Sequence, residues 1–122
     1  MKVVADIEGL TPGQKHDFHI HQYGDCSAPD ATSAGRHYNP DGHQHGLPDG
    51  ENRHAGDLGN VQADQQGKAH YEITVTNISI MGAKNPIIRR GVIVHAKVDV
   101  GGQPVGNAGA RNACGVIGVA KQ

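Results

Sequence analysis

Hydrophobic and polar residues alternate in several short stretches of this chain, and a period of two is typical of half-buried β-strands. In residues 2–8, Val3, Ala5 and Ile7 lie on one face while Asp6 lies on the other. Similar stretches predict further strands over residues 16–21, 58–63, 69–75, 91–97 and 115–120. The pattern therefore predicts an all-β protein of about six strands.

The segments between these strands have no apolar periodicity. Residues 22–57 contain no convincing regular element, and residues 100–109 are rich in glycine. Residues 77–90 predict an irregular connection in which some apolar side chains are buried (apolar plugs). With 18 Gly, one Phe and no Trp, the chain is expected to have a thin core and long loops. An irregular span as long as 22–57 is uncommon in a compact domain unless it is functional or tied down.

Length and charge narrow the class of protein. A chain of 122 residues is expected to form a single domain, residues 1–122. Its formal net charge of −1 argues against a nucleic-acid surface, and no apolar run approaches the roughly 18 residues that span a bilayer. The N-terminus also lacks the apolar stretch of a signal peptide. We therefore expect neither a nucleic-acid nor a membrane partner.

Histidine, with nine copies, is the compositional outlier. Segment 37–57 carries four of them and a nearby carboxylate: His37, His43, His45, His54 and Asp57. Because this segment is rich in Gly and Pro, it cannot hold a shape by burying side chains. Three imidazoles and a carboxylate that converge on zinc would order it, since zinc takes N and O ligands at roughly 2.0–2.2 Å and adds folding energy. The alternative is a solvated polar loop.

A second histidine group lies on a predicted strand. In residues 16–21, His19 and His21 share one face while Phe18 and Ile20 point to the other. Two imidazoles so placed can bind one ion, and a rigid strand holds them in position. Taken alone the pair is weak evidence, because an exposed pair of histidines is the usual explanation.

The two cysteines, Cys26 and Cys114, are far apart in the sequence. A disulfide between them would close a long loop and stabilise the fold by about 4–5 kcal/mol in the chain-entropy model. The spacing alone equally allows two free buried thiols.

Six short motifs occur in a characteristic order: FHIH at 18–21, GDC at 24–26, TSAGRHYNP at 32–40, RHAGDLGN at 53–60, VH at 94–95 and GNAGARNACGVIG at 106–118. In this order and spacing they closely resemble the copper/zinc superoxide dismutase family in its bacterial-looking form, over about residues 2–120. The resemblance implies an immunoglobulin-like, flattened Greek-key β-barrel or sandwich with a long metal-binding loop. The family's usual eight strands would be about six here.

The resemblance also implies a site for two metal ions. The copper ligands would be His19, His21, His37 and His95. The zinc ligands would be His37, His45, His54 and Asp57, so that His37 is shared by both metals. Imidazole suits both Cu(II) and Cu(I), as a redox-cycling metal requires.

Further positions match the family outside these ligand sets. Asp99 matches a carboxylate that links the copper and zinc ligands, and Cys26–Cys114 matches the family's disulfide. The other histidines match no ligand position: we expect His43 to be exposed and His16 to brace the backbone near the site.

The activity implied is that of an antioxidant oxidoreductase, with copper and zinc ions as cofactors and superoxide as partner. Superoxide would be converted to oxygen and hydrogen peroxide by Cu(II)/Cu(I) cycling, while zinc stays structural. Two residues are expected to be catalytic. Arg111 would dock the superoxide anion, since guanidinium stays charged at any working pH, and His37 would hold a proton when copper is reduced.

Two departures from the family pattern affect assembly and kinetics. Relatives usually begin with a two-stranded hairpin before the strand that starts here at Lys2. Its absence would expose the edges of strands 2–8 and 115–120, so we expect a homo-oligomer, most simply a dimer, through these edges or the adjacent apolar face. Segment 98–106 is shorter than the family's charged loop and carries one charge, Asp99, which predicts weaker steering of superoxide.

Steering would then depend mainly on Lys97 and Arg111. Asp17 and Arg36 also differ from relatives, in which Gly is common at both positions, and the sequence offers no physical reason for either.

Two other functions share these features. One is a non-catalytic copper/zinc-binding or copper-delivery domain of the same fold, and the other is a zinc-stabilised structural domain. The enzyme is favoured because the four copper histidines and Arg111 are all present, whereas a zinc-only domain gives His95 no role. A persistent disulfide favours a periplasmic or extracellular location, but a cytoplasmic one stays possible because no signal peptide is visible.

Overall fold

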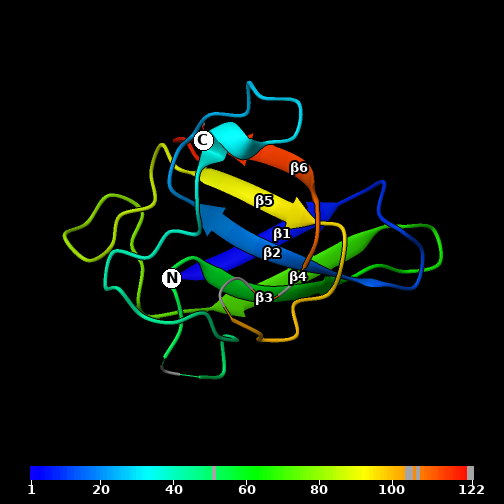
Figure 1. Ribbon diagram of the computed structural model, residues 1–122, viewed down its shortest axis with the longest axis horizontal. Helices are drawn as coiled ribbons and strands as arrows, with labels where there is room; N and C mark the ends of the chain where they lie inside the picture. The colour runs from blue at the N-terminus through cyan, green and yellow to red at the C-terminus, as the bar shows by residue number, and fades with distance from the viewer. Residues whose placement is uncertain (51, 104–105, 107, 121–122) are drawn as a thin grey trace.

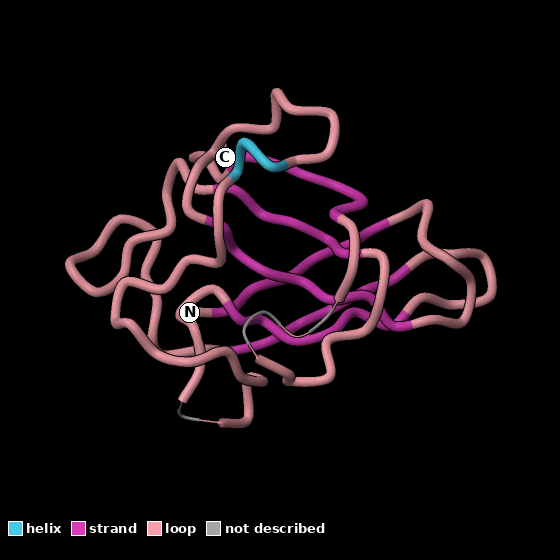
Figure 2. The backbone as a smooth tube through the Cα atoms, viewed as in Figure 1, coloured by secondary structure: helices cyan, strands magenta, loops and turns pink. Residues whose placement is uncertain are grey.

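The computed structural model describes residues 1–50, 52–103, 106 and 108–120. Within these residues the chain forms six strands and one short 3-10 helix, joined by long loops (Figures 1 and 2). In chain order the elements are β1 (Lys2–Ile7), β2 (Lys15–His21), the 3-10 helix η1 (Thr32–Ala34), β3 (Asp57–Gln62), β4 (Ala69–Thr74), β5 (Gly91–His95) and β6 (Arg111–Val116). The predicted all-β class is confirmed.

The strands form two antiparallel sheets. One contains β1 and β4, and the other has the order β3-β2-β5-β6, so that β2 and β5 are its central strands. Figure 1 shows the larger sheet running from β6 at the top through β5 and β2 to β3. Because β2 and β5 each have neighbours on both sides, they are the most firmly held strands available to carry a functional site.

The hydrophobic core fills the space between the two sheets. Phe18 of β2 meets Tyr71 of β4 edge to face, with ring centroids 6.2 Å apart. The Tyr71 hydroxyl donates a hydrogen bond of 2.6 Å to the carbonyl of Leu58 on β3. Phe18 and Ile20 are buried in this core, as the alternation in residues 16–21 predicts. The opposite face of β2 is thereby left to His19 and His21.

The last strand is not where the sequence predicts it. We expected residues 115–120, but β6 spans Arg111–Val116. The partner strand decides this position, since β6 pairs with β5 from His95↔Arg111 to Gly91↔Val116 and β5 begins at Gly91. Beyond Val116 the chain pairs instead with the connection before β5, through hydrogen bonds between Ile117 and both Arg89 and Arg90.

Other boundaries shift less. The fifth strand ends at His95 rather than at residue 97, and the irregular span 22–57 contains one turn of 3-10 helix, η1. The apolar plugs expected in residues 77–90 are Ile78 and Ile87, both buried. The expected glycine-rich loop over 100–109 includes positions 104, 105 and 107, which lie outside the described residues.

A disulfide joins Cys26 to Cys114 and spans 88 residues of sequence. It fixes the start of the long loop to β6. Cys114 also packs against a small apolar cluster of Ala31, Ala34 and Ile93. Of the two states that the cysteine spacing allows, the disulfide is therefore the observed one. Among the described residues there is no helix with the length and apolarity needed to cross a bilayer.

Candidate metal centre

Two adjacent central strands supply three of the histidines. His19 and His21 project from β2 and His95 from the end of β5, and all three are buried. The antiparallel register Phe18↔Val94 to His21↔Gly91 brings them together. The ring centroids of His19 and His95 are 5.3 Å apart, and those of His21 and His95 are 5.7 Å apart.

The long loop adds His37 to this group. The loop is laid against β2 by a bridge between His21 and His37 and by a hydrogen bond from the Tyr38 N–H to the Ile20 carbonyl. The His37 ring lies with its centroid 3.8 Å from that of His19 and 4.9 Å from that of His21. Ring nitrogens of His19, His21, His37 and His95 all lie within 4.8 Å of one another.

The hydrogen bonds of these rings leave nitrogen lone pairs for an ion. His21 Nδ1 donates to the Gly35 carbonyl at 2.9 Å, and His95 Nδ1 donates to the Gly109 carbonyl at 3.3 Å. Their Nε2 atoms are buried and have no hydrogen-bond partner among the described residues. An imidazole whose one N–H is held by a carbonyl presents its other nitrogen as a metal ligand. The four-histidine group therefore fits copper.

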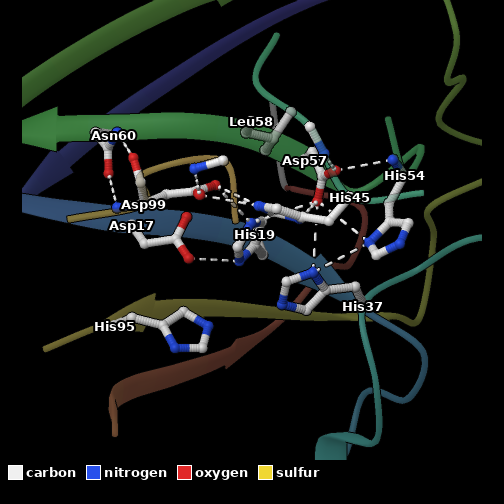
Figure 3. Close-up of polar contacts among 12 residues, drawn as sticks. Asp17, His19, His37, His45, His54, Asp57, Leu58, Asn60, His95 and Asp99 are labelled. Atoms are coloured by element: carbon white, nitrogen blue, oxygen red, sulfur yellow. Dashed lines mark hydrogen bonds and ion pairs between the residues drawn. The ribbon is translucent and has the colours of Figure 1, made fainter. Parts of the chain in front are cut away.

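A second group surrounds one carboxylate oxygen, Asp57 Oδ1. Ring nitrogens lie around it at 3.1 Å (His45), 3.4 Å (His37) and 3.5 Å (His54), and Figure 3 shows these side chains converging on Asp57. His37 Nδ1 and His54 Nδ1 are 3.2 Å apart. In a tetrahedral zinc shell with bonds of about 2.0 Å, ligand atoms lie about 3.3 Å apart. The group therefore fits zinc.

The loop fixes Asp57 through its other oxygen and its backbone. Asp57 Oδ2 accepts hydrogen bonds from the backbone N–H of His54 at 2.8 Å and of Gly46 at 3.0 Å. Arg53 Nη1 donates to the Asp57 carbonyl at 2.9 Å. Asp57 Oδ1, by contrast, has no hydrogen-bond partner among the described residues. The oxygen that faces the imidazoles is thus the one left for a cation.

Asp99 links the two groups. One of its oxygens lies 2.8 Å from His45 Nε2 and 3.4 Å from His19 Nε2. Asn60 holds Asp99 in place, since its amide accepts from the Asp99 N–H at 2.6 Å and donates to the Asp99 carbonyl at 3.0 Å. The carboxylate thereby contacts one ring of each group.

The protonation of the side chains in this centre follows from burial and from the nearby carboxylates. Burial lowers the pKa of His21 to about 3 and the pKa values of His37 and His95 to about 4, so these rings are neutral at neutral pH. Burial opposes a charged His45 too, but hydrogen bonds to Asp57 and Asp99 raise its pKa to about 9. Neutral imidazoles are the form that binds metal ions.

A pocket of about 910 Å³ opens onto this centre and is lined by His37, His54 and His95 together with Arg36, Arg90 and Arg111. Arg111 is oriented by a hydrogen bond from Nη1 to the Ala31 carbonyl at 2.8 Å. Arg90 lies over the Tyr38 ring, 3.8 Å from its centroid. Three guanidinium groups around one opening favour a small anion as the molecule that enters.

The sequence alone did not identify all of the charged residues that line this pocket. Arg36 and Arg90 line the pocket, whereas Lys97, expected to help guide an anion, is exposed and is not among its lining residues. No periodic pattern marks either arginine; the position of Arg36 directly before His37 was the only available signal. His43 is exposed and His16 Nδ1 donates to the His95 carbonyl at 2.9 Å, so both of those expectations are confirmed.

Comparison with known proteins agrees with this geometry. The family model described as copper/zinc superoxide dismutase matches residues 1–117. The chain is 46% identical over 129 residues to "Superoxide dismutase (Cu-Zn)" of Paramecium bursaria Chlorella virus 1, covering 100% of this chain and 68% of that protein. It is 46% identical to "Superoxide dismutase (Cu-Zn) 2" of Brassica juncea over 96% of this chain and 80% of the relative. The corresponding protein of Schizosaccharomyces pombe is 45% identical, over 98% and 81%.

Proposed function

This chain belongs to the copper/zinc superoxide dismutase family, and from this premise we propose that its buried histidine centre converts superoxide to oxygen and hydrogen peroxide. The protein is an oxidoreductase that uses copper and zinc. The observation that carries the proposal is the group of four imidazoles whose nitrogens lie within 4.8 Å of one another beside a pocket lined by Arg111.

In this proposal the ligands divide between two metals. Copper is held by His19, His21, His37 and His95, and zinc by His37, His45, His54 and Asp57. The supporting observations are the free buried nitrogens of the first group and the spacing of the second group around Asp57 Oδ1. His37 belongs to both groups, and its Nδ1 faces Asp57 and His54.

The bound copper supplies one-electron redox chemistry, and zinc, which has no redox chemistry, supplies positive charge and order. The residues of the chain bind the substrate and provide a proton. Arg111 presents a permanently charged guanidinium in the pocket, so it docks the superoxide anion. His37 lies between the two groups and also lines the pocket, so its Nε2 can hold a proton within reach of that anion.

The test is the dismutation rate of protein reconstituted with one copper and one zinc per chain, with zinc-only protein as the blank. A fast, copper-dependent rate is expected. A rate no better than that of free copper would contradict the proposal and favour a copper-binding or copper-delivery role.

A single substitution separates the two ligand sets. We predict that His95→Ala abolishes dismutation while zinc stays bound, because His95 belongs only to the copper group. Metal content by mass spectrometry and the dismutation rate would be measured on the same sample. Retained activity would refute the role of His95.

We also propose that the chain self-associates as a dimer through its sheet edges or the adjacent apolar face. In the described part of the chain, β1 has only β4 as a neighbour and β6 has only β5. Val4 on β1 is 51% exposed and Val116 on β6 is 57% exposed, so apolar side chains accompany open edges. Exposed edges of this kind favour pairing with another chain.

Sedimentation equilibrium at micromolar concentration tests the assembly. A dimer is expected, and it should be weakened by Val116→Lys, which places a charge at the open edge. A monomer over the whole concentration range would contradict the proposal without affecting the proposed activity.

A further inference from the structure

Asp17 is a carboxylate within the metal centre that the ligand sets above do not use. It lies on the central strand β2, between His16 and Phe18, and its side chain is fully buried. The backbone at this position is held by a hydrogen bond from the Asp17 N–H to the Lys97 carbonyl at 2.9 Å. Asp17 is therefore fixed in place by the sheet and has no access to water.

The carboxylate of Asp17 points at a proposed copper ligand. Asp17 Oδ2 lies 2.9 Å from His19 Nδ1, a contact marked in Figure 3. The direction of this contact is not that of a hydrogen bond, and both oxygens of Asp17 have no hydrogen-bond partner among the described residues. His19 is also its only ion-pair partner there. A buried carboxylate that accepts no hydrogen bond is unfavourable unless a proton or a cation neutralises it, and a metal ion bound at His19 would supply the positive charge.

The spacing of the two atoms matches a pair of neighbouring ligands on one metal ion. In square-planar or tetragonal copper sites with bonds of about 2.0 Å, adjacent ligand atoms lie about 2.8 Å apart. The observed separation of Asp17 Oδ2 and His19 Nδ1 is 2.9 Å. His19 belongs to the four-imidazole group and also to a separate group with Asp17 and Asp99, so His19 is the residue through which Asp17 adjoins the proposed copper ligands.

We propose that Asp17 is a fifth ligand of copper in this protein, a carboxylate bound beside His19 Nδ1. The inference rests on the proposed copper site and adds to it a ligand that the family's four histidines do not include.

A carboxylate ligand changes the redox balance of the site. Carboxylate oxygen is a hard, negatively charged donor and favours Cu(II), whereas imidazole suits both oxidation states. Asp17 therefore stabilises the oxidised site and lowers its reduction potential. Loss of a residue that only supports a metal ligand typically weakens metal binding by about 10–100-fold, so loss of a ligand should weaken it at least tenfold. A tenfold weakening of Cu(II) binding with Cu(I) binding unchanged corresponds to a rise of about 59 mV.

The test uses the zinc-loaded protein and Asp17→Asn, which keeps the shape of the side chain but removes its charge. Cu(II) and Cu(I) dissociation constants, the Cu(II) EPR spectrum and the reduction potential are measured. We expect Cu(II) binding to weaken by about tenfold and the reduction potential to rise by about 59 mV. The hyperfine splitting in the EPR spectrum should change as well. Asp17→Gly provides a second variant that removes the carboxylate altogether and should shift all three in the same direction.

A matched control is Glu8→Gln, which removes one exposed carboxylate charge outside the metal centre. It should leave the EPR spectrum and the potential unchanged. If both Asp17 variants keep the wild-type spectrum and potential, Asp17 is not a ligand and the inference is wrong, although the copper site stands. If wild-type protein binds no Cu(II) with nitrogen ligands, the proposed function fails as well.

Discussion

At the scale of single residues, the centre depends on which nitrogen or oxygen of each side chain is left without a partner. His21 and His95 each spend one nitrogen on a backbone carbonyl and keep Nε2 free. Asp57 does the same with its two oxygens, because Oδ2 is held by backbone N–H groups while Oδ1 faces the imidazoles. Prior hydrogen bonds thus determine which atoms are available to bind metal.

Arg36 should act on the rate of substrate arrival. Its side chain is exposed and lines the pocket beside His37. We predict that Arg36→Gln lowers kcat/KM for superoxide by about two- to threefold at low salt, because charges near an opening act mainly on association. The effect should shrink as salt is added, since screening weakens exposed charges.

Stopped-flow rates at low and high ionic strength would measure this difference. Arg89→Gln is the matched control, because Arg89 is also exposed but is not among the residues that line the pocket. Equal effects of the two substitutions would show that overall charge, rather than the position of Arg36, governs the rate.

At the scale of elements, β2 is the strand against which the other parts are placed. On one side it pairs with β5, which carries His95, and on the other with β3, which begins with Asp57. The long loop is fastened to it by a chain of backbone hydrogen bonds that joins Ile20, Tyr38 and Gly56. The sheet histidines proposed to bind copper and the loop residues proposed to bind zinc therefore share one rigid support.

Gly56 marks the closest approach of loop and strand. A Cβ at this position would collide with the Ile20 carbonyl oxygen. We predict that Gly56→Ala pushes the loop away from β2, lowers the free energy of unfolding by about 1–3 kcal/mol and weakens zinc binding, because His54 and Asp57 flank it. Thermal unfolding and zinc titration would measure both.

Gly118→Ala is a suitable comparison, since a Cβ there meets no atom within 4 Å. It should change neither stability nor zinc affinity appreciably. Zinc affinity equal to that of wild type in Gly56→Ala would show that the loop can reach the metal without this contact.

The small sheet carries a pH-dependent contact away from the metals. Hydrogen bonds that the His70 ring donates to Asp6 at 2.6 Å and to Glu72 at 2.9 Å raise the pKa of His70 above its ordinary value. A raised pKa in the folded state means that the contact stabilises the fold fully below about pH 6.5 and is lost as pH rises through the folded-state pKa. We predict that His70→Gln lowers Tm more at pH 5.5 than at pH 9, and a pH-independent difference would contradict this.

Some strands of this chain are determined by their own local pattern of residues, and others by the strand with which they pair. Alternation alone places β1, β2 and β4 to within a residue or two, because each strand shows a hydrophobic and a polar face. β6 is misplaced by about four residues, since its position depends on where β5 begins rather than on its own alternation. Family motifs indicate the histidines proposed as ligands, but only the fold shows that Asp17 lies beside His19 and that Arg36 lines the pocket.

At the scale of the whole molecule, a thin core is supplemented by covalent and ionic ties. The apolar cluster lies between the sheets and takes in Tyr38 and Ala55 from the long loop, which is joined to β6 by the Cys26–Cys114 disulfide. In residues 37–57 most of the buried side chains are polar, namely three histidines, Arg53 and the carboxylate of Asp57. Without metal these groups are polar, buried and incompletely paired, which is a costly arrangement. Metal binding and folding are therefore coupled in this protein.

Removal of zinc should consequently destabilise the whole fold. Zinc at about a thousand times its dissociation constant adds about 4 kcal/mol to the free energy of unfolding. In a chain of this size that corresponds to roughly 10–20 °C in Tm. We predict a fall in Tm of this order when a chelator removes zinc from the disulfide-bonded protein. Asp57→Asn should lose most of this zinc-dependent stability, because Oδ1 lies at the centre of the zinc group.

Asp41→Asn serves as the control for Asp57→Asn, because Asp41 is an exposed carboxylate of the same loop. Among the described residues, the Asp41 side chain forms a hydrogen bond only with Asn85. Calorimetry of the three proteins, each with and without chelator, compares them directly. Wild type and Asp41→Asn should share the zinc-dependent shift, whereas Asp57→Asn should begin near the chelated value. If complete removal of zinc leaves the Tm of wild type unchanged, the buried histidines and carboxylates must be satisfied without metal, and the coupling argued here is wrong.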